Sequence, residues 1–349
     1  MRAAVADGRG SIEITTVPDP SPGPDDLVLR VEACGICGSD LKLLQYASAG
    51  TTMGHEFSGE VVAVGERAAE RLRAGDRVAA LPVIGCGTCP RCQLGDPARC
   101  VSPDLIGVLG SPGAFAEFVR VSARETFRLP EGVDAVTGAL VEPLAVGLHV
   151  VRSADLRPWD TLLVLGAGPV GQAVILWARH LGVREIVASD PLPARRAAAL
   201  AFGATAVIAP NAEDVAAAFT AQAGGPADVV AECVGKGGML QASVDLVAPG
   251  GRVVMAGAAG EPDPVIPGLL VLKEVSIRFA GYYTRDEWSY ALRMLAQGRI
   301  DPRPMVTATA GLGDLPAVFA ALGGPTEHSK VVMLTGAPDG TWPGSPASP

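Results

Sequence analysis

Residues 162–174, with the sequence LLVLGAGPVGQAV, decide the fold of this chain. An apolar run leads into three glycines in the spacing G-x-G-x-x-G, and a second apolar run follows them. The first glycine permits a tight turn, the second lets a pyrophosphate approach the backbone, and the third lets a strand and a helix pack closely. The segment therefore predicts the turn of a dinucleotide-binding βαβ unit. Its expected cofactor-binding residues are Gly166, Gly168, Pro169, Val170 and Gly171.

The next apolar run, EIVASD at 185–190, ends in an acid 19 residues after Gly171. A carboxylate at the end of the second strand accepts both hydroxyls of the adenosine ribose and repels a 2′-phosphate. Asp190 therefore favours NAD over NADP. Arg195 follows closely and could accommodate that phosphate, so NADP stays open; the alternative is that Arg195 and Arg196 form a solvated first helical turn.

The alternation of strands and helices continues beyond this turn. Apolar runs alternate with amphipathic runs over 159–283, which predicts a parallel sheet covered by helices on both faces. The first 130 residues instead consist of short β runs divided by turn residues. We expect an α/β protein with a doubly wound nucleotide-binding domain at 151–286. The remainder, 1–150 and 287–349, is expected to form one β-rich domain.

Composition argues against several classes of partner. The 349 residues carry a formal net charge of −9 without a cluster of Lys and Arg, so no nucleic-acid or anionic-membrane surface is expected. The N-terminus lacks a signal-like apolar core, and apolar runs are broken before they reach membrane-spanning length. We expect a cytoplasmic protein. The Pro- and Gly-rich tail beyond Gly336 is expected to fray.

Four of the seven cysteines lie in the segment CGTCPRCQLGDPARC at 86–100. In a reducing cytoplasm such closely spaced thiols favour a metal site over disulfides, and four thiolates close a tetrahedral zinc shell without leaving a position for substrate. We expect a structural zinc; a disulfide framework and an iron–sulfur cluster are the alternatives. The expected ligands are Cys86, Cys89, Cys92 and Cys100.

A second, sparser set of metal-binding side chains lies upstream. Cys37 offers a thiolate, His55 an imidazole and Glu56 a carboxylate. A catalytic zinc takes fewer protein ligands than a structural one and keeps an exchangeable position. Because the chain has only four histidines, one flanked by Gly and Glu is informative. Taken alone, such a histidine would more often be structural.

Several motifs together resemble one family. They are GICGSD, GHEFSGEVVAVG, GDRV, the four-cysteine segment, EPLAVGLHV, LGAGPVG and the closing KVV. From the N-terminus to about Leu334 the chain resembles the zinc-dependent medium-chain alcohol dehydrogenases, especially the polyol (sorbitol-type) and threonine dehydrogenase branch. The resemblance implies a GroES-like catalytic domain, a Rossmann domain, one catalytic and one structural zinc, and a nicotinamide cofactor.

The resemblance also implies the ligands of the catalytic zinc. Cys37 and His55 match ligand positions, and Cys34 is then a spare thiol that packs in the interior. Glu56 and Glu142 stand where the family has its remaining ligand. We expect one of these glutamates to bind directly and the other through water or by exchange.

Two neighbours of Cys37 match family positions that serve the reaction, and a third departs from the family's pattern. Asp40 matches the carboxylate that fixes the tautomer of the zinc-binding histidine, and Ser39 matches the hydroxyl that passes on the substrate proton. Many relatives then carry a histidine where this chain has Lys42. A lysine with a lowered pKa could replace that histidine, could contact the cofactor ribose, or could be exposed without a role.

The expected activity is hydride transfer between a secondary alcohol or ketone and a nicotinamide cofactor, on a polyol, sugar, cyclitol or natural-product intermediate. The segment LLQYASAGTTMG at 43–54 is shorter than is usual in relatives, which puts a specific substrate in doubt. The alternatives are an NADPH-dependent reductase of an activated double bond or imine, and a redox-silent nucleotide-binding protein. By resemblance we expect a homodimer or homotetramer, assembled through the strand near Phe279.

Overall fold

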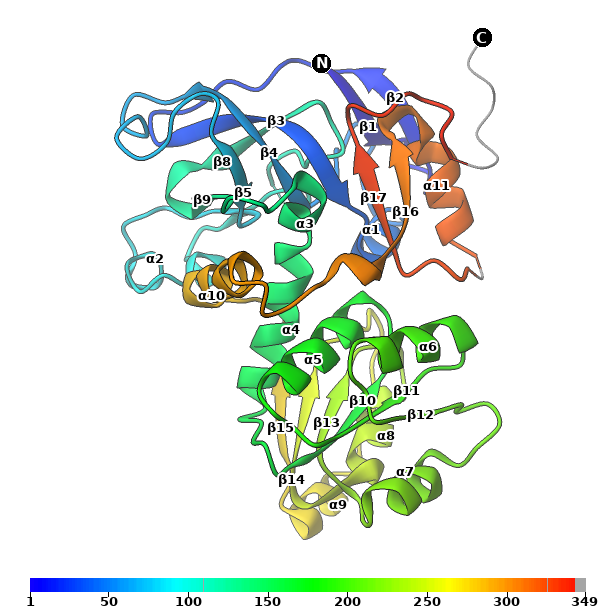
Figure 1. Cartoon of the computed structure of the whole chain (residues 1–349). Coiled ribbons are helices and arrows are strands. Elements are labelled where there is room, and N and C mark those ends of the chain that lie inside the picture. The colour runs from blue at the N-terminus through cyan, green and yellow to red at the C-terminus, as the bar shows by residue number, and fades with distance from the viewer. Residues whose placement is uncertain (109, 325, 343–349) are drawn as a thin grey trace. The chain divides into compact units, whose positions relative to one another are not determined.

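The computed structural model describes residues 1–108, 110–324 and 326–342, and it divides the chain into two compact units (Figure 1). The first unit comprises Met1–Glu142 and Tyr283–Pro349, and the second comprises Pro143–Tyr282. The chain thus leaves the first unit once and returns to it.

The second unit contains a parallel sheet in the order β12-β11-β10-β13-β14-β15 (Figure 1). Its strands are β10 (Thr161–Leu165), β11 (Glu185–Ser189), β12 (Ala206–Ile208), β13 (Ala227–Glu232), β14 (Val247–Met255) and β15 (Ser276–Phe279). The connecting helices are α5 (Pro169–His180), α6 (Pro193–Ala201), α7 (Val215–Ala223), α8 (Met239–Leu246) and α9 (Pro267–Lys273). The predicted doubly wound fold is confirmed, because apolar strands such as Leu162–Leu165 are buried on both faces.

The first unit is built on a seven-stranded sheet in the order β16-β17-β3-β4-β5-β9, with β8 also paired to β3. These strands are β3 (Asp26–Gly35), β4 (Glu56–Val64), β5 (Arg77–Ala80), β8 (Phe118–Ser122), β9 (Thr126–Arg128), β16 (Val306–Gly311) and β17 (Lys330–Leu334). Two small antiparallel pairs add β1 (Arg2–Ala6) with β2 (Ile12–Thr16), and β6 (Val83–Ile84) with β7 (Asp104–Leu105). The expected β-rich architecture is confirmed.

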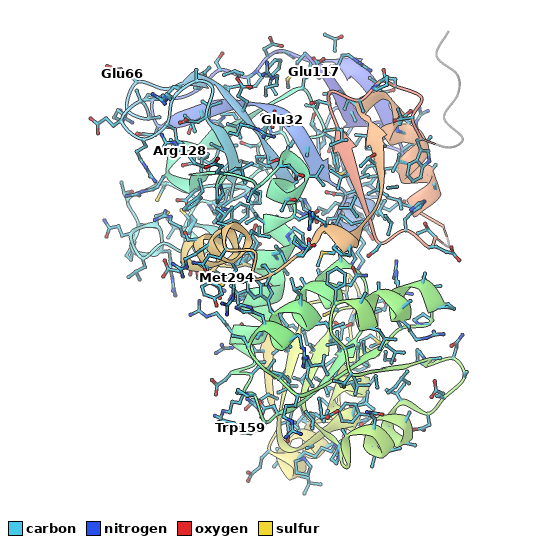
Figure 2. All side chains as sticks on the ribbon, viewed as in Figure 1. Glu32, Glu66, Glu117, Arg128, Trp159 and Met294 are labelled. Carbon is cyan, nitrogen blue, oxygen red and sulfur yellow. The ribbon has the colours of Figure 1, made fainter. Side chains whose placement is uncertain are left out.

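Helices of the first unit are mostly short. They are α1 (Gly38–Leu43), α2 (Pro90–Gln93), α3 (Ala135–Ala139), α10 (Arg285–Ala296) and α11 (Leu315–Leu322), and α4 (Val141–Ser153) begins there. Single 3₁₀ turns are η1 (Pro97–Arg99), η2 (Ala123–Glu125), η3 (Arg303–Met305) and η4 (Leu312–Asp314). Met294 on α10 is buried, with 8% exposed, whereas Trp159 in the second unit is 74% exposed. Both residues are labelled in Figure 2.

The described part of the C-terminal tail does not fray as expected. Asp314 is 2% exposed, and its carboxylate accepts from the backbone N–H groups of Gly340, Thr341 and Trp342. The Trp342 side chain is buried in the core of the same unit. A single buried carboxylate therefore anchors a tail whose composition alone predicts disorder. Residues 343–349, which the same expectation covered, lie outside the described residues.

One described helical segment, Ala135–Ser153, is long and apolar enough to cross a membrane, although no such segment was expected from the sequence. Protein buries 72% of its apolar window. Burial of this kind is typical of a core helix, in which apolar side chains pack against protein.

Candidate metal and dinucleotide sites

The register of β3 and β4 brings two distant segments to one edge of the sheet. Gly35, the last residue of β3, lies opposite Glu56, the first residue of antiparallel β4. Cys37 follows the end of β3 and His55 precedes the start of β4, so both reach the same edge. A Cβ on Gly35 would stand 2.1 Å from Glu56 Oε2, so only glycine leaves room for the Glu56 side chain here.

Helix α1 orients the side chains beside Cys37. The Asp40 carboxylate accepts from the Cys37 backbone N–H at 2.9 Å, and its other oxygen lies 3.2 Å from His55 Nδ1. Asp40 is fully buried, and neither of the two facing atoms has a hydrogen-bond partner elsewhere among the described residues. Asp40 thus orients the imidazole so that Nε2 is directed away from it. Ser39 is half-buried and Lys42 is exposed, and their i, i+3 spacing places them on one face of α1.

Cys37, His55 and Glu56 form a compact group of potential ligands. One ligand atom from each lies within 4.8 Å of the others, and His55 and Glu56 are buried. Burial alone would lower the pKa of His55, but the negative charges of Asp40 and Cys37 outweigh it and raise that pKa well above its usual value. Thiolate, imidazole and carboxylate donors in a site of excess negative charge fit a zinc ion. Cys34 is buried in the core and is not part of the group.

Sequence reasoning missed a buried cation that faces Glu56. Lys330 Nζ donates to both Glu56 oxygens, at 2.6 and 2.7 Å, and to the Ile36 carbonyl at 2.9 Å. Lys330 and Glu56 are each about 1% exposed. Burial lowers the pKa of Lys330, but the charge of Glu56 outweighs that effect and raises it. The available signal was the closing KVV motif, in a chain with only four lysines.

A buried tyrosine was missed as well. The Tyr283 hydroxyl donates to Glu142 Oε1 at 2.9 Å, and each of the two residues is 7% exposed. Burial raises the pKa of Glu142 to about 7, partly against the opposing effect of His55. Burial and the Glu142 carboxylate raise the pKa of Tyr283 well above its usual value. Glu142 is therefore electrostatically coupled to the metal-ligand group, although its oxygens are not among those within 4.8 Å of each other.

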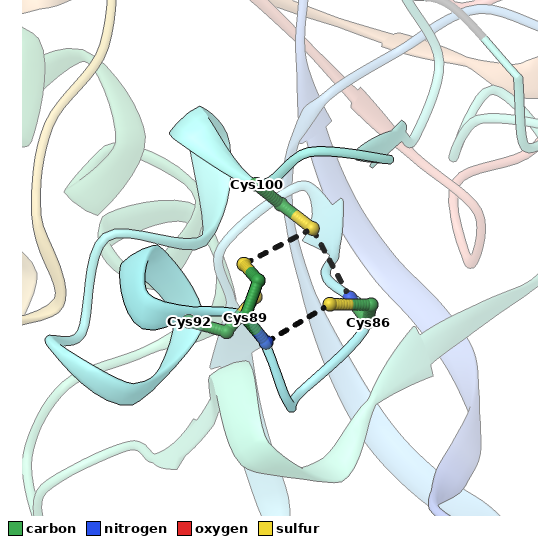
Figure 3. A group of neighbouring side chains, drawn as sticks. All are labelled: Cys86, Cys89, Cys92 and Cys100. Carbon is green, nitrogen blue, oxygen red and sulfur yellow. Dashed lines mark hydrogen bonds between the residues drawn. The ribbon is translucent and has the colours of Figure 1, made fainter.

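The four predicted cysteines of the 86–100 segment come together (Figure 3). Their sulfur atoms lie within 4.8 Å of one another, and Cys89 Sγ is 3.8 Å from Cys100 Sγ. A tetrahedral zinc with bonds of about 2.3 Å separates its sulfur ligands by about 3.8 Å, whereas a disulfide joins them at about 2.05 Å. All seven cysteines are free. The segment fits a closed metal site and does not form disulfides.

The environment of the four thiols differs strongly from one to the next. Backbone N–H groups of Thr88 and Cys89 stabilise the Cys86 thiolate and lower its pKa to about 6. Burial raises the pKa of Cys92 to about 12. Cys86 is exposed, whereas Cys92 is 2% exposed. Without a metal, the cluster therefore contains both a reactive thiolate and a protected thiol.

The glycine turn links β10 to α5 as predicted. A Cβ on Gly171 would stand 1.9 Å from the Gly166 carbonyl oxygen, so this close approach of helix and strand requires glycine. A Cβ on Gly168, the N-cap of α5, would meet nothing within 4 Å. Pro169 and Val170 form the first turn of α5, whose N–H groups and dipole favour an anion. The turn therefore leaves open space beside an anion-binding helix terminus, which fits a dinucleotide.

Asp190 lies at the end of β11, but its carboxylate is already engaged. It accepts from Ala167 N in the glycine turn and from Leu192 N, each at 2.9 Å, and it is 2% exposed. Arg195 Nη1 lies 4.0 Å from Asp190 Oδ2, and the buried Arg195 Nε has no partner among the described residues. Arg196 donates to the backbone carbonyls of Asp190 and Pro191 rather than standing free in solvent.

Comparison with known proteins finds two matching family models. The model described as "Alcohol dehydrogenase GroES-like domain" matches residues 23–131, and the model described as "Zinc-binding dehydrogenase" matches residues 169–297. Together they cover parts of both units.

Individual proteins are similar over most of the chain. The 2-dehydro-3-deoxy-L-galactonate 5-dehydrogenase of Pseudoalteromonas atlantica is 32% identical over 95% of this chain and 98% of its own length. Human (Homo sapiens) sorbitol dehydrogenase is 31% identical over 87% of both chains. A Sinorhizobium meliloti 1021 protein described as a zinc-binding dehydrogenase, whose crystal structure is bound to NADP, has a TM-score of 0.87 and 33% identity over 95% of this chain and 98% of its own.

We predict that the buried Lys330–Glu56 pair contributes to the free energy of unfolding. In chelator-treated protein, Lys330→Met leaves the Glu56 carboxylate buried without its cation, so the free energy of unfolding in urea should fall by about 3 kcal/mol. The double variant Lys330→Met/Glu56→Gln should recover more than half of this loss, because no uncompensated charge remains. The exposed Lys236→Met is the matched control, expected within about 0.5 kcal/mol of the native protein. Native-like stability of Lys330→Met alone would contradict the assignment.

The different pKa values of the cysteines predict different rates of alkylation. Near pH 7, metal-free Cys86 with a pKa of about 6 is about nine-tenths thiolate, whereas Cys92 with a pKa of about 12 stays a thiol. Iodoacetamide should therefore modify Cys86 first and Cys92 last, as followed by peptide mass spectrometry. Lowering the pH through 6 should slow the Cys86 reaction, and adding zinc should protect all four sulfur atoms. Buried Cys34 should stay unmodified throughout; equal rates at Cys86 and Cys92 would contradict the prediction.

Proposed function

The chain belongs to the zinc-dependent medium-chain alcohol dehydrogenases, in the polyol (sorbitol-type) branch, and from this premise we propose that it interconverts a secondary alcohol and a ketone with NAD as the preferred cofactor. It is a zinc-dependent, nicotinamide-dependent alcohol dehydrogenase acting on a small-molecule alcohol. The observation that carries the proposed chemistry is the compact group of Cys37, His55 and Glu56, with Asp40 behind His55.

Cys37 and His55 would hold the catalytic zinc, and Glu56 or Glu142 would complete the site. Glu56 is the nearer glutamate, but Lys330 occupies both of its oxygens. Direct binding by Glu56 therefore requires that it share a carboxylate oxygen with Lys330 or release it. A second, structural zinc would be held by Cys86, Cys89, Cys92 and Cys100.

When bound, zinc would supply a Lewis acid that lowers the pKa of the alcohol, and the nicotinamide cofactor would supply the acceptor for hydride. The protein supplies the orientation and the path of the proton. Asp40 fixes the His55 ring, which keeps Nε2 available as a ligand. Ser39 would accept the substrate hydroxyl proton, and Lys42, on the same face of α1, would pass it to solvent.

We assign the cofactor to the second unit and the alcohol site to the first. These correspond to a nucleotide-binding domain at about 151–286 and a catalytic domain at 1–150 with 287–349. NAD is preferred because the Asp190 carboxylate, at the end of β11, disfavours a 2′-phosphate. Arg195 is the residue through which NADP would be accommodated. The ribose hydroxyls would donate to the lone pairs of Asp190 that Ala167 and Leu192 leave unused.

The substrate class is proposed from the relatives. Those similar to this chain act, by their names, on sorbitol and on a deoxy sugar acid. A polyol, sugar or cyclitol, or a hydroxylated natural-product intermediate, is therefore the proposed substrate. A small organic substrate, rather than a nucleic acid or a membrane, agrees with the acidic composition, and we propose a cytoplasmic location.

We also propose that the chain forms a homodimer or homotetramer through β15. This strand lies at the edge of the sheet, where its backbone groups can pair with a second copy. Exposed apolar side chains adjoin it: Phe279 is 71% exposed, and Val271 and Leu272 on α9 are 75% and 84% exposed. Such a patch is typical of a protein–protein contact.

A panel of polyols, sugars, cyclitols and amino alcohols tests the function. With zinc-loaded protein, reduction of NAD should be observed with at least one secondary alcohol, and kcat/KM should be about tenfold lower with NADP. Cys37→Ser and metal removal should each abolish turnover, and zinc should restore only the metal-depleted native protein. Turnover of an activated double bond or imine with NADPH alone would favour the reductase alternative. Cofactor binding without turnover of any compound would favour the redox-silent alternative.

Light scattering tests the assembly. The native protein should have the mass of two or four chains, and Phe279→Glu should reduce it toward a single chain, because a charge then faces its own copy across the two-fold pair. Trp159→Glu alters an equally exposed apolar side chain away from β15 and should leave the mass unchanged. A monomeric native protein would overturn the proposed assembly.

A further inference from the structure

Tyr283 is the point at which the first unit resumes after the nucleotide-binding unit. Its hydroxyl reaches Glu142, one of the two glutamates proposed to complete the catalytic site, at 2.9 Å. Both side chains are buried. The direction of the Glu142 carboxylate therefore depends on where the chain places Tyr283.

The start of α10 holds Tyr283 in place. Thr284 is the N-cap and forms a capping box with Glu287: its N–H donates to Glu287 Oε2 at 2.8 Å, and Glu287 N–H donates to Thr284 Oγ1 at 3.3 Å. The Tyr283 ring stacks on the fully buried Trp288, with 5.8 Å between centroids and 28° between planes. The tyrosine is thus attached to the first turn of α10 through both backbone and ring.

The next residue ties α10 to the four-cysteine segment. Arg285 N–H donates to the Gly95 carbonyl at 3.1 Å, within the loop between Cys92 and Cys100. Its guanidinium forms a two-point contact with Glu125, in which Nε donates to Oε2 at 3.1 Å and Nη2 donates to Oε1. Glu125 is 2% exposed and ends η2.

These contacts form one continuous path. The four-cysteine loop and Glu125 hold Arg285, Arg285 begins α10, and the residue before the α10 cap points its hydroxyl at Glu142. We propose that Arg285 is a positioning residue: Glu125 holds its guanidinium, Gly95 accepts its N–H, and the Glu125 contact sets the Tyr283–Glu142 contact through the start of α10. The proposal rests on the proposed function, because it gives Glu142 a place in the catalytic site.

The physical reason is the precision that a reacting centre requires. A displacement of about 1 Å at a catalytic group can cost about a hundredfold in rate. The bidentate Arg285–Glu125 contact restrains both the direction and the distance of the α10 terminus, which a single hydrogen bond does not. Removal of the guanidinium would let this terminus shift while the helix itself stays folded, since its capping box and buried face remain.

A double-mutant cycle on kcat tests the proposal. Tyr283→Phe should lower kcat about tenfold with KM for the alcohol within about threefold, because the donor to Glu142 is lost. Arg285→Ala should lower kcat about fivefold in the native background but less than about twofold in the Tyr283→Phe background, because it acts through the missing hydroxyl. Arg285→Lys keeps a charge beside Glu125 and should restore part of the loss. If Arg285→Ala lowered kcat by the same factor in the native and Tyr283→Phe backgrounds, the proposal would be overturned.

A second experiment uses a spectroscopic signal and does not require turnover of a substrate. Near-ultraviolet circular dichroism reports the stacking of Tyr283 on Trp288, and Arg285→Ala should change this signal in zinc-loaded and metal-depleted protein. Arg303→Ala removes an exposed arginine that pairs with Asp301 in the same unit and should leave both the signal and kcat unchanged. If the native protein turned over no alcohol, the proposed function would fail, but circular dichroism would still report whether Arg285 positions Tyr283. An unchanged signal in Arg285→Ala would overturn the coupling itself.

Discussion

The buried ion pair between Lys330 and Glu56 joins the elements on which the rest of the first unit depends. Lys330 begins β17, Glu56 begins β4, and the Ile36 carbonyl that Lys330 also contacts follows β3. A cation and an anion can be buried together only when their geometry compensates for lost hydration. This requirement holds the end of β3 together with the starts of β4 and β17, and the proposed metal ligands extend from that edge. The ion pair also restrains the one glutamate that lies among those ligands.

The two groups of potential metal ligands differ in whether they would leave a coordination position for a substrate. Four sulfur atoms in one short segment lie within 4.8 Å of one another, and four such ligands would fill a tetrahedral shell and leave no position for a substrate. The sparser group draws on two strand ends and is backed by Asp40, Lys330 and the Glu142–Tyr283 pair. The charged side chains around this group can share a metal ligand or exchange one partner for another. The proposed structural group is therefore distinguished by ligands that lie close together along the chain. The proposed catalytic group is distinguished by contacts with residues far away in the sequence.

The glycine turn and Asp190 show how one carboxylate can serve both fold and recognition. Asp190 accepts the Ala167 N–H and so stabilises the glycine turn, which is the proposed cofactor site. The acid expected to recognise a ribose is thus also part of the scaffold that presents the pyrophosphate site. Replacing it would alter the turn and the cofactor preference together, because both depend on the same two oxygens.

Local patterns in the sequence determined the doubly wound unit, the glycine turn and the four-cysteine group, because each depends on residues within one strand, turn or loop. The family motifs extended this to Cys37, His55, Glu56 and Asp40. Only the tertiary structure decided the partners of Glu56, Glu142 and Glu125, which lie 274, 141 and 160 residues away along the chain. Side chains that meet across such separations leave no spacing or periodicity in the sequence. Their pairing follows from strand register and helix placement, which exist only once the chain has folded.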